Sequence, residues 1–386
     1  MMTGLMIASV SIILFGVALT NLGMAILLLG CLVSPAIYRK KSWTEIPTAL
    51  WIGLVLFGWM ALSAFWSVGI PENIFESIRK YREFLLLPIM LIGVRQLGRL
   101  SWVREVMYGS LLISVLVSFL LWLDWIDIPG SELSLKNRIF FGISTSVFFY
   151  WSLLRTSTAG FVRWYGMLSA LLAVFSLLVI ENGRTGYVIT ITFLGIYLWS
   201  RYPGWNRRLV WLTILAGVLY GIYYLDDGLA HRVNESIINL NANVNSDRVS
   251  SVSYRIEFYR NTVRGWQSAP LVGHGVGSFP TSIELFYNPD RPWGLTDNPH
   301  QQYLLFLYEG GVVAFVLFCL FLLLLMSNAM KKNNRHLQGV VIAMSISCLF
   351  NSSFLDSGDG NFYCLVILYF LTLSFEKSQQ DIFYES

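Results

Sequence analysis

The sequence has little charge, histidine or cysteine. Only 13% of its 386 residues are Asp, Glu, Lys or Arg, whereas ordinary soluble domains carry about 25%. A chain with so little polar surface is not a soluble globular enzyme, and its 55% apolar residues exclude a disordered chain. The cysteines form no CxxC pair or Cys/His cluster, which excludes a disulfide scaffold and gives no indication of a metal site. They all lie inside apolar runs, at Cys31, Cys319, Cys348 and Cys364.

The sequence instead contains many long apolar runs. The mean hydropathy is +0.59, and a membrane-spanning helix needs about 20 apolar residues. The N-terminus has neither a basic stretch nor a cleavage site, so it is interpreted as the first span rather than a removable signal. The sequence therefore predicts an all-α polytopic membrane protein with about twelve transmembrane helices. Their predicted positions are 4–20, 22–38, 47–66, 82–97, 106–123, 139–155, 165–180, 187–200, 209–225, 301–326, 337–352 and 361–375.

Basic residues predict the orientation. With both termini in the cytoplasm, more than half of the 27 Lys and Arg residues fall in short inside segments, as the positive-inside rule requires. Residues 1–225 then hold helices one to nine. Residues 226–299 form one large outer loop that contains helices, and residues 300–386 hold helices ten to twelve and a cytoplasmic tail.

Arginines on the outer side are the first candidates for function. Arg79 and Arg82 lie at the entrance to the fourth predicted helix, and Arg138 precedes the sixth. Long basic side chains in such places often contact lipid phosphates. Arg184 differs, because the tight turn ENGRTG holds it close to the bundle, where an unpaired charge is costly and a functional role is the default hypothesis.

The outer loop contains two predicted helices, LAHRVNESIINL and SVSYRIEFYRNTVRGWQS. On the second, Arg260 and Arg264 share a face, while Arg255 points elsewhere. The following LVGHGVGSF stretch has GxGxG rather than GxGxxG spacing and no strand before it, which excludes a nucleotide-binding loop. Its glycines instead predict a tight chain path close to other helices, with His274 as loop filler.

A histidine and a glutamate mark the start of the tenth predicted helix. Pro299 suits a helix first turn, so His300 is expected at a helix N-terminus, which favours neutral imidazole. A lone histidine there is either an interfacial polar residue or a general base. Glu309 lies about 180° round this helix from His300 and is expected to form an ion pair with a neighbouring helix. The remaining outer aspartates are interpreted as scattered, solvated loop charges: Asp226, Asp227, Asp290, Asp297, Asp356 and Asp359.

Outer arginines, one histidine and no acidic metal cage fit one kind of chemistry. Arginine binds phosphate bidentately and keeps its charge, which suits the diphosphate of a lipid-linked donor. A neutral histidine takes a proton from an attacking hydroxyl, and the leaving diphosphate needs charge stabilisation more than protonation. Together these groups predict glycosyl transfer to an acceptor hydroxyl without ATP, metal or cofactor.

Three motifs in a fixed order add a family resemblance. ENGRTGY, then SYRIEFYRNTVRGWQSAPLVGHGVGSF, then NPHQQYLLFLYEGG resemble the O-antigen ligase and polymerase superfamily, over about residues 130–326. The resemblance implies that Arg184 and Arg255 are the essential arginines that bind the donor diphosphate and that His300 is the catalytic histidine. Arg138 is a lesser diphosphate ligand, and Arg260, Arg264, Arg79 and Arg82 are weaker candidates. Gln301 and Ala269 depart from the family pattern, where Asn and His are usual.

The resemblance implies an enzyme of lipopolysaccharide biosynthesis. An O-antigen ligase is a metal-independent, inverting glycosyltransferase. It moves polysaccharide from undecaprenyl diphosphate to lipid A–core at the periplasmic face of the bacterial inner membrane, among membrane lipids and with no nucleic acid. The alternative is an O-antigen or exopolysaccharide polymerase with the same donor and a lipid-linked glycan as acceptor, but polymerases tend to have two large outer loops. A transporter is the third hypothesis, and the sequence shows no internal repeat to favour it.

Overall fold

The computed structural model describes residues 17–95, 101–128, 137–180, 183–202, 204–207, 209–211, 213, 217, 251–287 and 296–384. Within these ranges the regular structure is entirely helical, which confirms the predicted all-α class. Most of the first and ninth predicted spans and the predicted helix LAHRVNESIINL lie outside the described residues.

The first half of the chain contributes α2 (Val17–Leu32), η2 (Pro35–Tyr38), α3 (Lys40–Thr44), α4 (Thr48–Leu62), η3 (Ser63–Trp66), α5 (Pro71–Lys80), α6 (Arg82–Val94), α7 (Ser101–Trp122), α8 (Arg138–Arg155), α9 (Gly160–Phe175), the π-helical η4 (Ser176–Ile180) and α10 (Arg184–Arg201). The second half contributes α13 (Ser251–Ser268), α14 (Phe279–Ser282), η5 (Ile283–Leu285), α15 (Gln302–Lys331), α16 (Arg335–Phe350) and α17 (Ser357–Tyr384).

Four helices are long and apolar enough to cross a membrane. They are Thr48–Trp66, Trp102–Trp122, Gly160–Ile180 and Gln302–Lys331, and the shorter apolar helices are Thr20–Leu32, Arg335–Phe350 and Gly358–Leu373. The helices α4, α6 to α10 and α15 to α17 coincide with predicted spans to within about five residues at most ends, whereas the sequence analysis did not predict α5. Judged by the length and composition of the described helices, four are candidate membrane spans, so the predicted count of about twelve is not confirmed.

One predicted boundary is wrong. The break expected between the first two spans, at Asn21, lies inside the continuous helix α2. A polar side chain is accommodated inside an apolar helix where it finds hydrogen-bond partners on neighbouring helices. Here the Asn21 Oδ1 accepts hydrogen bonds from Arg82 at the start of α6 and from Asn361 of α17, at 2.9 Å for Asn361.

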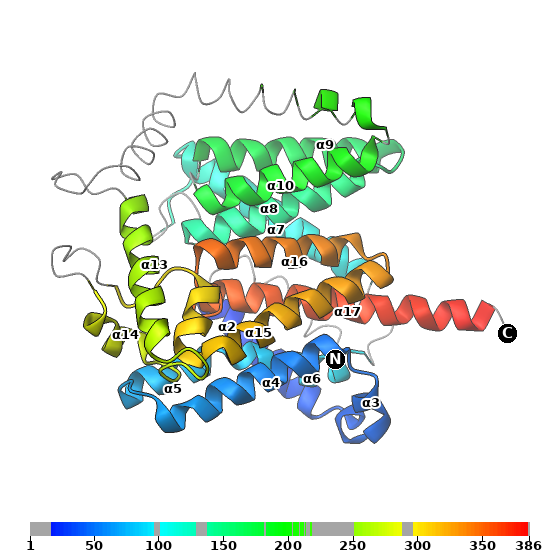
Figure 1. Cartoon of the computed structure of the whole chain (residues 1–386). Coiled ribbons are helices and arrows are strands. Elements are labelled where there is room, and N and C mark those ends of the chain that lie inside the picture. The colour runs from blue at the N-terminus through cyan, green and yellow to red at the C-terminus, as the bar shows by residue number, and fades with distance from the viewer. Residues whose placement is uncertain are drawn as a thin grey trace.

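The long helices lie side by side as a bundle whose two ends differ (Figure 1). Helices α4, α15, α16, α8 and α10 run along its length, while α5, α13 and α14 gather at one end and α3 lies at the other. α15 packs against both α4 and α16, and α8 packs against α9 and α10. Because α8, α10 and α15 start near the α13 end and finish at the α3 end, their basic last turns lie at the α3 end.

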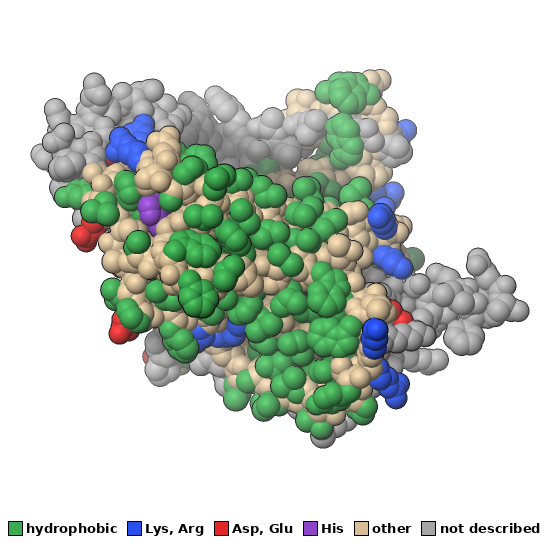
Figure 2. Space-filling view, turned by 60° about the horizontal axis from the view of Figure 1, so that its bottom comes forward, with side chains coloured by type: hydrophobic (Ala, Val, Ile, Leu, Met, Phe, Trp, Pro, Cys, Tyr) green, Lys and Arg blue, Asp and Glu red, His purple; other side chains and the backbone are tan. Residues whose placement is uncertain are grey.

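Large apolar side chains cover the outside of the bundle as well as its core. Val55 and Leu62 of α4 and Val316 and Leu323 of α15 are exposed. Figure 2 shows apolar side chains over most of one face, with several Lys and Arg side chains along its right edge and others at the upper left and below the centre. A monomeric soluble protein seldom exposes so much continuous apolar surface, whereas a lipid-facing surface requires it.

Candidate functional site

A glycine-rich loop forms the floor of the α13 end. Gly273, Gly275 and Gly277 have φ angles of 69°, 89° and 70°, which favour glycine. A Cβ atom on Gly275 would lie 2.3 Å from the Ser67 Cα, so no other residue fits without movement. The predicted tight path close to other helices is therefore confirmed.

Glu309 of α15 forms a hydrogen bond that connects this loop to the bundle. Its side chain is buried, and its Oε1 accepts a hydrogen bond from the Gly277 amide at 3.0 Å. The expected ion pair with a neighbouring helix is wrong, since none of the ion pairs among the described residues includes Glu309. The loop reaches α15 because Gly311 breaks its helical geometry with a φ of 68°, and the Val312 amide then donates to the Pro270 carbonyl at 3.0 Å.

His274, interpreted from the sequence as loop filler, has a packing role instead. Its Nε2 lies 2.9 Å from the Gly265 carbonyl oxygen of α13, and its ring centroid lies 4.7 Å from that of Tyr308 in α15. The side chain thus ties the loop to two helices. The sequence shows the residue but not these partners, which come from either side of the loop.

His300 lies in a short segment just before α15. The helix begins at Gln302, and Gln301 is its N-cap, whose side chain accepts from the Leu304 amide at 3.0 Å. The expectation that Pro299 occupies the first helical turn is wrong, because this glutamine caps the helix two residues later. His300 itself has a φ of 52°, a left-handed conformation that its own amide supports by donating to the Asn298 Oδ1 at 2.9 Å.

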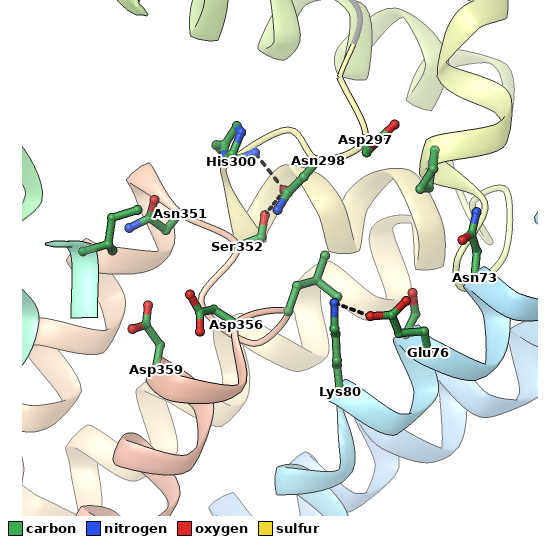
Figure 3. Close-up of a pocket in the computed structure, with 14 residues that line it drawn as sticks. Asn73, Glu76, Lys80, Asp297, Asn298, His300, Asn351, Ser352, Asp356 and Asp359 are labelled. Carbon is green, nitrogen blue, oxygen red and sulfur yellow. Dashed lines mark hydrogen bonds and ion pairs between the residues drawn. The ribbon is translucent and has the colours of Figure 1, made fainter. Parts of the chain in front are cut away.

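Asn298 also links this segment to the α16–α17 connection. The Ser352 hydroxyl donates to the same Asn298 Oδ1 at 2.6 Å (Figure 3). One side-chain oxygen therefore holds the backbone of His300 and the start of the neighbouring loop together. Sequence reasoning missed Asn298. The signal was its place two residues before the histidine, in an Asn-Pro pair that favours a turn.

Arg255 and Phe258 of α13 face His300. The ring centroids of Phe258 and His300 are 6.1 Å apart. Burial lowers the pKa of the His300 imidazole below its ordinary value, and the nearby Arg255 guanidinium lowers it further. The neutral imidazole is therefore favoured at pH 7, as expected from the sequence, and its burial and the neighbouring cation are the causes. The structure thus brings Arg255 and His300 together.

Arg138 and Arg184 begin two neighbouring helices at the same end of the bundle. The first turns of α8 and α10 approach closely, because a Cβ on Gly186 would lie 3.1 Å from the Gly142 Cα. Both arginines are exposed. The α8 start reaches the α16–α17 connection, since the Asn137 Nδ2 donates to the Asp356 Oδ2 at 3.0 Å.

The four weaker candidates have local partners. Arg260 and Arg264 are exposed on α13, as their shared face predicts, and contact Glu257 at 3.5 Å and Asn261 at 3.3 Å. Arg79 lies 4.0 Å from Glu76 on α5. Arg82 contacts Asn21 of α2 and lies 3.9 Å from the buried Glu83.

A cavity of about 760 Å³ opens beside His300 (Figure 3). Its walls come from α5, the 296–300 segment and the connection from α16 into α17. Three aspartates interpreted as scattered loop charges meet here: Asp297, Asp356 and Asp359. Asp297 is exposed, as expected, but the solvated interpretation is wrong for Asp359, which is 0% exposed.

Asp356 and Asp359 lie near each other where the chain enters α17, whereas Asp297 comes from the 296–300 segment (Figure 3). Within the described part of the chain, no group of three or more His, Cys, Asp or Glu side chains lies close enough to hold a metal ion. The sequence did contain a signal for Asp359 that was not used. The residue lies at the start of an apolar helix, and ionisable groups at membrane depth are functional candidates by default.

This is the architecture of a polytopic membrane protein with a polar site at one end of its bundle. Residues 168–319 match the family model described as O-antigen ligase. The match confirms the resemblance seen in the motifs. Members of the family are glycosyltransferase-like enzymes. No curated protein matches the chain.

The matched range contains some of the candidate site residues but not all of them. Arg184, Arg255, His300 and the glycine-rich loop lie inside residues 168–319. Arg138 and the cavity carboxylates Asp356 and Asp359 lie outside them.

Proposed function

We propose that this protein is an O-antigen ligase. It transfers polysaccharide from undecaprenyl diphosphate to lipid A–core, with inversion, at the periplasmic face of the bacterial inner membrane. The family match supports glycosyl transfer from a lipid-linked glycan, and the apolar helices support the membrane setting. The basic last turns at the α3 end support a cytoplasmic position for that end and for both termini.

The observation that carries this proposal is the neutral histidine held beside an arginine. An acceptor hydroxyl needs a base, and burial together with Arg255 keeps the His300 imidazole unprotonated at pH 7. The same guanidinium suits an anionic donor, because it presents fixed donors to phosphate oxygens. Two neighbouring side chains therefore supply a base for the acceptor and a cation for the diphosphate, which are two requirements of this glycosyl transfer.

The reaction then proceeds in one displacement. The acceptor oxygen forms a bond to the anomeric carbon while the bond from that carbon to the diphosphate oxygen breaks. The proton of the hydroxyl passes to His300, and the electron pair leaves with the diphosphate. Arg184 and Arg255 stabilise the departing charge, with Arg138 as a further ligand at the neighbouring helix start. Attack from the face opposite the leaving group inverts the anomeric centre.

Polymerase is the second candidate function, because the same family match and the same donor chemistry fit it. The single large outer loop of the sequence favours the ligase. A glycolipid gel of a deletion strain decides between them. Loss of a ligase leaves bare core, whereas loss of a polymerase leaves core that carries one repeat. Unchanged glycolipids of both kinds would refute the proposed function.

A further inference from the structure

The cavity beside His300 has the opposite character to the arginine side. Its walls include Glu76, Asp356 and Asp359, while Arg138, Arg184 and Arg255 do not line it. Its one lysine, Lys80, is neutralised by Glu76, with 2.9 Å between Nζ and Oε1 (Figure 3). A diphosphate entering this space would meet the carboxylates of Asp297 and Asp356, which no cation of the cavity wall neutralises. An uncharged or cationic ligand rich in hydrogen-bond donors meets no such repulsion.

Two buried polar groups in the cavity wall have unused hydrogen-bonding capacity. Neither Asp359 carboxylate oxygen has a hydrogen-bond partner among the described residues, and the same is true of the Asn351 Nδ2. Ser353 interacts with Asp359, but its hydroxyl donates to the Ser347 Oγ at 3.2 Å. Burying polar atoms without partners costs about 1–3 kcal/mol each, more for charged groups. A buried polar group without a partner requires an explanation, and a bound ligand that supplies the missing hydrogen bonds is one.

The rest of the wall is held in place. The Lys80–Glu76 pair joins adjacent turns of α5, and Asp356 is fixed by Asn137 at 3.0 Å. Asn298 forms the wall next to His300 and is itself held by Ser352. The volume of about 760 Å³ lies within the range of about 300–1,000 Å³ of ordinary small-ligand sites. The site is therefore preformed for part of a glycan.

We propose that this cavity binds the acceptor glycan of the transfer reaction. The terminal sugar donates hydroxyl hydrogens to Asp359 and accepts from Asn351, and it presents the reacting hydroxyl to His300. The diphosphate donor approaches from the α13 side. This inference rests on the proposed function for its ligand, but the cavity and its unpartnered groups are independent of it.

Two measurements on the full-length protein in proteoliposomes test the acceptor site. In the first, a photoreactive residue replaces Leu355, which lines the cavity, or Leu285, which is 79% exposed and outside it. The probes are lipid A–core glycolipid and, separately, an undecaprenyl-diphosphate oligosaccharide. The glycolipid should crosslink at position 355 and not at 285. Crosslinking of the donor alone at position 355 would overturn the proposal.

The second measurement is kinetic. Asp359→Asn keeps the size of the side chain and should raise the KM for lipid A–core about tenfold or more while leaving the KM for the donor unchanged. Asp127→Asn, the same change at an exposed position outside the cavity, is the matched control. Asn351→Ala is the second variant if Asp359→Asn does not fold. Normal acceptor KM values in folded variants would overturn the proposal.

The two proposals fail in different ways. Glycolipid crosslinking at Leu355 without any transfer by the wild-type protein would refute the proposed function and support the cavity as a glycan site. Transfer by the wild-type protein, with no crosslinking at Leu355 and normal acceptor KM values in the variants, would support the function and refute the cavity.

Discussion

The two sides of His300 carry opposite charge. Towards α13 the imidazole meets Arg255, with Arg260 and Arg264 further along the same helix. Towards α17 it meets a cavity whose walls carry Asp356 and Asp359. Both sides are only partly open to solvent, so neither charge is fully screened.

In the proposed reaction, this difference lets one histidine serve an anionic diphosphate on one side and an uncharged sugar on the other. The cation on one side attracts a diphosphate and keeps the imidazole neutral, which is the form that accepts a proton. The carboxylates on the other side repel the diphosphate and accept hydrogen bonds from sugar hydroxyls. In this scheme donor and acceptor are separated by electrostatics, and they meet only at His300.

Removing the shared histidine should have the largest effect. His300→Ala should lower the rate of transfer about 10²–10⁴-fold, because the attacking hydroxyl loses its base. Donor binding should persist, since the arginines remain. The measurement is single-turnover transfer alongside binding of the lipid-linked donor. If His300→Ala loses donor binding as severely as Arg255→Ala does, the histidine is a diphosphate ligand and not the base.

The arginine side should be next in size. Arg184→Ala and Arg255→Ala should each lower transfer about 10²–10³-fold in protein that still folds and inserts, because charge stabilisation of the leaving diphosphate is lost. Lysine should rescue only partly, since it lacks the bidentate fork. Arg260→Ala and Arg264→Ala, on the exposed face, are the controls and should stay within a few-fold of wild type. Full activity of both Arg184→Ala and Arg255→Ala would refute the diphosphate assignment.

The acid limb of the pH profile of transfer reports how Arg255 affects the pKa of His300. Burial and Arg255 lower the pKa of His300, so the neutral base persists below the ordinary value of about 6.5 and activity falls as pH drops through the lowered pKa. Arg255→Gln removes the cation, so the pKa of His300 should rise and the acid limb should move to higher pH. The readout is the pH dependence of residual kcat at saturating donor. An unshifted limb, like that expected of Arg264→Gln, would show that Arg255 does not act on His300.

Chelation should have the smallest effect on transfer. We expect purified protein to work in EDTA, because no described cluster of carboxylates is close enough to hold a metal. Activity is measured with EDTA and after addition of Mg²⁺ or Mn²⁺. Loss in the chelator with recovery in metal would make the carboxylate side a cation site and would remove the contrast between the two sides.

Much of the fold follows from local sequence. The apolar runs predict α4, α6 to α10 and α15 to α17, because each run is long enough to bury backbone polar groups in its own hydrogen bonds. They do not predict α5, which is short and polar. The glycine spacing predicts the tight loop, since alternating positive φ angles require it. The Arg184, Arg255 and His300 motifs are visible without a structure, and the family match covers all three.

Only the tertiary structure decided which side chains meet. Nothing local distinguishes an Asn that breaks a helix from Asn21, whose partners lie on α6 and α17. Glu309 finds backbone amides of the glycine-rich loop instead of a cation, and Asp359 lies buried beside a cavity that His300 also lines. These partners are far apart along the chain, and helix packing alone brings them within reach. Periodicity reports the face on which a residue lies, but not the residue that faces it from another helix.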